Sequence, residues 1–109
     1  MPGADYTVRL YGEQTILHVL VANFDDADLV KELLSKPGIN VNAQDKYGNT
    51  PLHKAVFNGH SKAVTALLRA PGIDVNIKNK DGHTPLDKNH NQHILIHTHL
   101  RRAGAETTR

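Results

Sequence analysis

The sequence predicts an all-α protein in which pairs of short helices recur along the chain. The motif Thr-x-Leu-His, or Thr-x-Leu-Asp in its last copy, starts at positions 15, 50 and 84, at spacings of 35 and 34 residues. In the middle copy, Leu52, Ala55 and Val56 have the spacing of one helix face. The composition is 39% apolar and only 5% aromatic, which favours small side chains packed between thin layers.

The middle copy contains the start and stop signals of a helix. Thr50 can cap a helix N-terminus through its hydroxyl, and Pro51 suits the first helical position. Gly59 is placed to end this helix with a residue in the left-handed conformation. A second helix is then predicted from the apolar spacing of Val64, Leu67 and Leu68.

Loops with related sequences follow each second helix. Gly38 and Gly72 allow the chain to turn, and Val41 and Val75 are expected in short extended stretches. Turn tips are predicted at residues 45–48 and 79–82, because these segments are rich in Asp, Asn and Gly.

The run Thr50-Pro51-Leu52-His53 and its period resemble ankyrin repeats, in which a β-turn and two helices recur about every 33 residues. The resemblance implies a solenoid of stacked helix-turn-helix units with β-turn fingers, in which His53 links neighbouring repeats by hydrogen bonds. It covers residues 12–105, with repeats at about 12–46, 47–80 and 81–105. Residues 1–11 are expected to form an extension or arm, and residues 106–109 a tail.

The first and last repeats depart from the pattern. In the first, Phe24 replaces the helix-ending glycine and an acidic run (Asp25, Asp26, Asp28) precedes the second helix, where it complements the helix dipole. The alternation in residues 6–12 allows a short strand or an extended arm before it. In the last, Asp87 replaces His and Arg101 replaces Leu, as expected for a polar cap at a true end of the array. A piece of a longer array is the alternative.

The composition excludes several kinds of chemistry. The chain has no cysteine, so disulfides, thiol catalysis and cysteine-based zinc sites are absent. No nucleophile constellation or phosphate-binding loop occurs, and we therefore expect neither an enzyme nor a cofactor. No apolar run has the length of a signal peptide or membrane span. We expect a soluble, monomeric protein of the cytoplasm, with the nucleus as the alternative.

The formal net charge is +2, and the basic excess falls in the C-terminal third. Lysines could lie on one side of the stack, with Tyr47 and Phe57 as stacking groups for nucleic acid. These lysines are Lys46, Lys54, Lys78, Lys80 and Lys88. Without an arginine-rich stripe or a high net charge, nucleic acid is not the expected partner.

Five of the eight histidines lie after residue 80. His90, His93 and His97 have spacings that could place imidazoles on one face of a helix, where they could bind zinc. They are weak metal candidates because no firm further ligand accompanies them. A metal-binding or pH-responsive cap in the last repeat is thus an alternative function.

The resemblance implies that a protein partner binds to a concave face made of finger tips and first helices. Tyr47 and Phe57 are the expected anchors, and the lysines beside them favour a partner of acidic character. The alternatives are that Phe57 tucks against the next helix and that the array is a pure structural scaffold. By resemblance alone, Asn42 and Asn76 match loop asparagines that can be hydroxylated. The matching partner-binding positions are Asn23, Lys46, Tyr47, Asn49, Phe57, Asn58, Lys80, Asp81, His83, Asn91 and Gln92.

Overall fold

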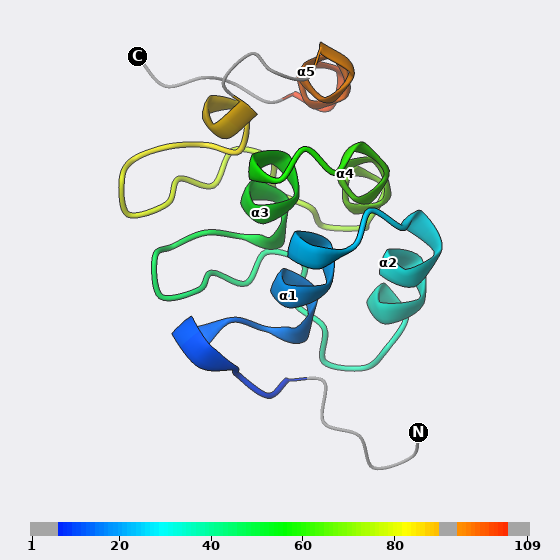
Figure 1. Ribbon diagram of the computed structural model, residues 1–109, viewed down its shortest axis with the longest axis vertical. Coiled ribbons are helices and arrows are strands. Elements are labelled where there is room, and N and C mark those ends of the chain that lie inside the picture. The colour runs from blue at the N-terminus through cyan, green and yellow to red at the C-terminus, as the bar shows by residue number, and fades with distance from the viewer. Residues whose placement is uncertain (1–6, 90–93, 105–109) are drawn as a thin grey trace.

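The computed structural model describes residues 7–89 and 94–104, which form two layers of stacked helices (Figure 1). The inner layer contains α1 (Ile16–Asn23), α3 (Pro51–Phe57) and the short 3-10 helix η2 (Leu86–Asn89). The outer layer contains α2 (Ala27–Leu34), α4 (Ser61–Leu68) and α5 (Ile94–Arg102). A further 3-10 turn, η1 (Tyr11–Glu13), precedes α1. The described residues contain no strand, so the predicted all-α repeat fold is confirmed.

The inner helices start as the sequence predicts. The Thr50 hydroxyl accepts a hydrogen bond from the His53 backbone N–H at 3.3 Å, and Pro51 occupies the first helical position. Thr15 and His18 form the same capping box at the start of α1. Gly59 follows α3 with a φ of 70°, in the left-handed region predicted for it.

Two aspartates cap helices of the outer layer, one within its own repeat and one across to the next. The Asp26 carboxylate accepts hydrogen bonds from the Asp28 and Leu29 backbone N–H groups at the start of α2. The neighbouring Asp25 carboxylate instead accepts from Lys62 at 2.8 Å and Ala63 at 3.1 Å. Because His60, the N-cap residue of α4, makes no side-chain cap hydrogen bond, the first repeat supplies this cap to the second.

One core runs through all the repeats between the two helical layers. It is built from Leu, Ile, Val and Ala side chains, as the composition predicts. Since each repeat is only two helices deep, its apolar side chains are buried mainly against the neighbouring repeat. The largest fully buried apolar members are Leu17, Val21, Val30, Leu52, Val56, Val64, Leu67, Ile96 and Leu100.

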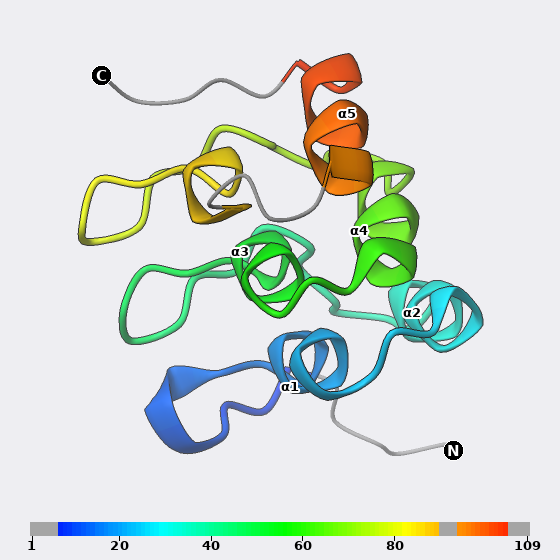
Figure 2. The same ribbon diagram turned by 45° about the horizontal axis from the view of Figure 1, so that its top comes forward.

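Three fingers project from the inner layer in the same direction, at residues 10–14, 45–49 and 79–83 (Figures 1 and 2). Backbone N–H groups close the fingers by donating from Leu10 to Gln14, from Asp45 to Asn49 and from Asn79 to His83. Adjacent fingers are joined because the Lys46 N–H donates to Gly12 and the Lys80 N–H to Tyr47. The predicted turn tips are therefore present.

The structure narrows one local prediction and corrects another. Of the short strand or extended arm expected over residues 6–12, the described part forms no strand, because Leu10 closes the first finger and Tyr11 begins a 3-10 turn. The extended arm stays a prediction. Val41 and Val75 lie in turns instead of extended segments. The first of these turns is closed by a hydrogen bond from the Ala43 N–H to the Asn40 carbonyl.

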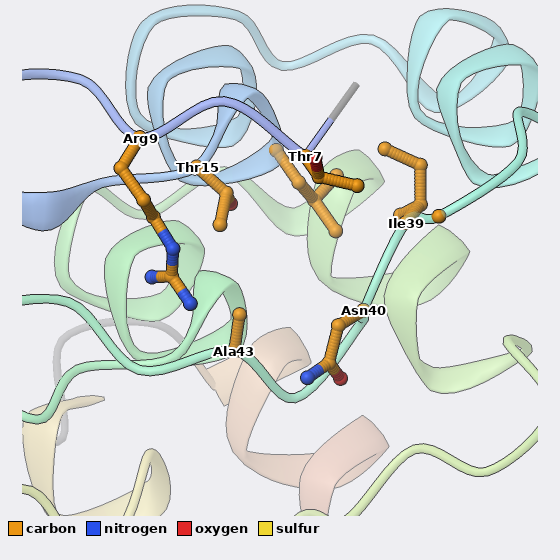
Figure 3. A pocket seen from close by; sticks show the side chains of 8 residues that line it. Thr7, Arg9, Thr15, Ile39, Asn40 and Ala43 are labelled. Atoms are coloured by element: carbon orange, nitrogen blue, oxygen red, sulfur yellow. The ribbon is translucent and has the colours of Figure 1, made fainter. Parts of the chain in front are cut away.

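The N-terminal segment lies against the loop that follows α2. Figure 3 shows Thr7 and Arg9 beside Ile39, Asn40 and Ala43, around a hollow. The volume of this hollow is about 80 Å³. The Arg9 guanidinium donates to the Glu13 and Gln44 carbonyls, which ties the segment to the first finger and to the residue before the second. The boundaries expected at residues 12 and 105 stay predictions, and the tail expected at 106–109 lies outside the described residues.

Within the described ranges, no helix has both the length and the apolar character needed to cross a membrane.

Candidate functional site

The surface formed by the three fingers and the inner helices, here called the finger face, carries exposed aromatic side chains. Tyr11 is 95% exposed on the first finger, and Tyr47 is 63% exposed on the second. Phe57, at the end of α3, is 64% exposed, so most of its side chain is accessible to solvent. Since most large apolar side chains of this chain are buried in its core, these aromatics mark the finger face as the candidate site.

Two neighbouring hollows lie between these aromatics. The first hollow, of about 190 Å³, is lined by Tyr11, Tyr47 and Lys46 together with Lys54. The second hollow, of about 140 Å³, is lined by Phe57, Asn49 and His53, and again by Lys54. The half-buried Lys54 therefore separates two cavities with aromatic walls. We call them the paired hollows.

Most sequence-predicted binding residues reach the surface. Tyr47 and Phe57 line opposite members of the paired hollows, and the Lys46 ammonium lies 6.0 Å from the centre of the Tyr47 ring. Asn91 and Gln92 lie outside the described residues. The exposed members of the predicted set are Asn23, Lys46, Tyr47, Phe57, Asn58, Lys80, Asp81 and His83.

Three asparagines of the predicted set are engaged within the fold. Asn49 is half-buried, and its side-chain oxygen accepts a hydrogen bond from the Asn79 amide at 2.8 Å, between two fingers. The Asn23 and Asn58 amides each donate to a carbonyl one helical turn earlier, at 2.8 Å. These contacts explain why asparagine suits each position without any partner.

Tyr11 and Lys54 are site residues that the sequence reasoning missed. From the sequence, Tyr11 is expected in an N-terminal extension. The 35-residue spacing between Thr15 and Thr50 also makes Tyr11 the equivalent of Lys46, which is predicted on a finger. Lys54 is predicted from the sequence only as one of several lysines that could meet nucleic acid. Lys54 lies four residues after the helix cap Thr50, and this position could have placed it on the exposed side of the helix that Thr50 begins.

The inner-layer histidines join the repeats as the resemblance implies. His18 Nδ1 accepts the Thr15 N–H at 3.0 Å, which leaves Nε2 to donate to the Asn49 carbonyl at 2.7 Å. His53 repeats this arrangement between Thr50 and the His83 carbonyl, at 3.0 and 2.8 Å. Burial lowers the pKa of His18 below its ordinary value of 6.5, which favours this neutral form.

The last repeat keeps only half of this arrangement. The Asp87 carboxylate accepts the Thr84 N–H at 2.9 Å, as the histidines do in their own repeats. A carboxylate has no proton to donate, so Asp87 cannot make the Nε2–H to carbonyl hydrogen bond by which His18 and His53 reach the next finger.

The metal hypothesis stays a prediction. His90 and His93 lie outside the described residues, as does the side chain of His97. In the described part of the chain, no group of three His, Cys, Asp or Glu side chains is placed to bind a metal ion.

A family model described as "Ankyrin repeats (3 copies)" matches residues 3–79. The chain belongs to the ankyrin repeat family. The stacked helix pairs, the fingers and the histidine links between repeats all agree with this assignment. Ankyrin repeats are generally protein–protein interaction modules, and they are typically noncatalytic.

Two relatives from Dictyostelium discoideum are similar to parts of this chain. The chain is 63% identical over 27 residues to "Stress-activated protein kinase alpha", which covers 25% of this chain and 4% of that protein. It is 46% identical over 58 residues to a probable serine/threonine-protein kinase, which covers 51% of this chain and 7% of that protein. The chain thus spans only a small part of the length of either relative.

Proposed function

We propose that the chain is a noncatalytic protein-interaction module that binds a protein partner through the finger face. The observation that carries this proposal is the exposure of Tyr11, Tyr47 and Phe57 around the paired hollows. Keeping a large apolar side chain in water forgoes roughly 1.5–3 kcal/mol of burial free energy. A partner that covers these aromatics would recover that free energy, and aromatic residues are typical anchors of interfaces.

The hydrogen bonds and packing around Tyr47 and Phe57 support a preformed site. Tyr47 lies on a finger whose Asp45 carboxylate accepts the backbone N–H groups of Tyr47 and Asn49 at 2.9 and 3.0 Å. Phe57 ends a helix that packs against both α1 and η2. Little conformational freedom would therefore be lost when a partner binds, which favours affinity.

The proposal is tested by affinity capture with mass spectrometry, using the double variant Tyr47→Ala with Phe57→Ala. We expect the variant to lose the partners that the parent chain captures, because each of the paired hollows then loses an aromatic wall and only Tyr11 stays. Phe24→Ala is the matched control, since Phe24 is 53% exposed but lines neither hollow.

Both proteins are first compared by circular dichroism, so that a loss of folding is recognised. Capture of the same partners by the double variant would place binding elsewhere and reject this site.

A further inference from the structure

The paired hollows present their chemistry in a fixed order. Tyr11 and Tyr47 line the first hollow, Phe57 lines the second, and Lys54 lies between them because it lines both. Any chain that follows the two hollows therefore meets an apolar wall, then an ammonium group, then a second apolar wall. This order arises because Lys54 lies on α3 between the second finger and Phe57.

The ammonium group of Lys54 is available to a negative partner. In the part of the chain that the structure describes, no carboxylate oxygen lies within 4.0 Å of the Lys46, Lys54 or Lys80 ammonium. Asp45 lines the first hollow, but it is 6% exposed and one of its oxygens already accepts two backbone N–H groups. A half-buried cation without a counter-ion gains more from a carboxylate than a fully hydrated one does.

Other acidic groups of the fingers do not fill the hollows. Glu13 and Asp81 are exposed at finger tips and line neither hollow. Lys46 adds a second positive charge to the first hollow, so its lining carries two lysines and one aspartate. The paired hollows are therefore a locally basic site on a chain whose net charge is only +2.

The size of the hollows favours side chains over an enclosed small ligand. Their volumes of about 190 and 140 Å³ fall below the roughly 300 Å³ at which small-molecule sites begin. Each hollow can instead receive one or two side chains of a passing peptide.

We propose that the paired hollows bind an extended peptide segment in which an acidic side chain lies between two apolar ones. The acidic side chain pairs with Lys54, one apolar side chain packs on Tyr11 and Tyr47, and the other packs on Phe57. This inference rests on the proposed function and adds to it the kind of segment that the partner presents.

The test is selection from a displayed library of random peptides on the immobilised full chain. We expect enriched peptides to carry Asp or Glu with apolar residues on both sides. A synthetic, fluorescent copy of an enriched peptide should then bind the Lys54→Gln variant about tenfold more weakly, because a charge-assisted hydrogen bond is lost. Lys54→Arg should retain most of the binding.

Lys31→Gln serves as the matched control, because Lys31 is an exposed lysine of the outer helix α2 and should leave binding unchanged. Enrichment of basic peptides, enrichment of none, or acidic peptides whose binding ignores Lys54→Gln would each overturn the inference. Tighter binding of a thymidine oligonucleotide than of the enriched peptide would also overturn it. None of these results bears on the proposed function, which is tested separately by the capture experiment with Tyr47→Ala and Phe57→Ala.

Discussion

At the level of single residues, the histidine links between repeats depend on one protonation state. His18 Nδ1 must be free of a proton to accept the Thr15 N–H, while Nε2–H donates to the Asn49 carbonyl. Burial lowers the pKa of His18, although the Asn49 hydrogen bond and the Asp45 carboxylate oppose this shift. Lys54 and Arg9 act with burial, because their positive charges disfavour the imidazolium.

We predict that His18 makes the chain less stable in mild acid. Its folded pKa lies below 6.5, so the unfolded chain binds a proton at a higher pH than the folded chain does. The free energy of unfolding then falls as the pH drops below about 6.5, until the pH passes the folded pKa. Urea unfolding at about pH 7.5 and about pH 5 measures this change, which should be larger in the parent than in His18→Gln.

The comparison with His18→Gln isolates this group from the other histidines, which both proteins contain. Equal losses of stability in the two proteins would contradict the assignment to His18.

At the level of elements, the fingers depend on glycines that meet different surroundings. Gly48 and Gly82 occupy matching finger positions, with φ values of 79° and 80°. A Cβ added to Gly48 would lie 2.8 Å from the Lys80 backbone nitrogen, whereas a Cβ on Gly82 would meet nothing within 4 Å. The second finger is therefore overlaid closely by the third, and only glycine fits at the contact.

We predict that Gly48→Ala is clearly more destabilising than Gly82→Ala. Both place alanine in the left-handed region, which costs about 1 kcal/mol at the lower end of the known range. Gly48→Ala must also move the third finger, so its total cost should reach about 2–3 kcal/mol. Chemical denaturation of the two variants measures the difference, and equal losses would show that the fingers separate without cost.

At the level of the whole molecule, the sequence predicts best what is local. The cap at Thr50, the proline after it and the glycine at 59 each act on the backbone within a few residues, so the repeat spacing revealed them. The Asp25 contact spans 37 residues to Lys62 and depends on how two repeats pack. The sequence pattern alone therefore could not tell that Asp25 caps α4 while the neighbouring Asp26 caps α2.

The candidate site shows the same division. Tyr47 and Phe57 were predicted because the repeat period gave their positions. The role of Lys54 became visible only when the hollows on both of its sides were defined by packing. Tyr11 was missed because the first finger begins before the residue at which the repeat was expected to start.

The repeats are tied by side chains that cross between them, so we predict that a cap in one repeat protects a helix in the next. The Asn42 amide donates to the Gly72 carbonyl, and His60 Nδ1 lies 2.9 Å from the Val21 carbonyl oxygen. Asp25→Ala should cost roughly 0.5–2 kcal/mol, the usual cost of a lost N-cap. Hydrogen exchange should then quicken at the start of α4, in the second repeat.

Asp26→Ala is the matched control, because it removes a cap of the same kind that lies within one repeat. Its faster exchange should begin at α2, while its cost in stability should be similar. If Asp25→Ala quickened exchange only in the first repeat, the cap would not couple the repeats. Faster exchange in α4 requires that the stability of its first turn depends on Asp25, a residue of the preceding repeat. A repeat that is stabilised by its neighbour unfolds together with that neighbour.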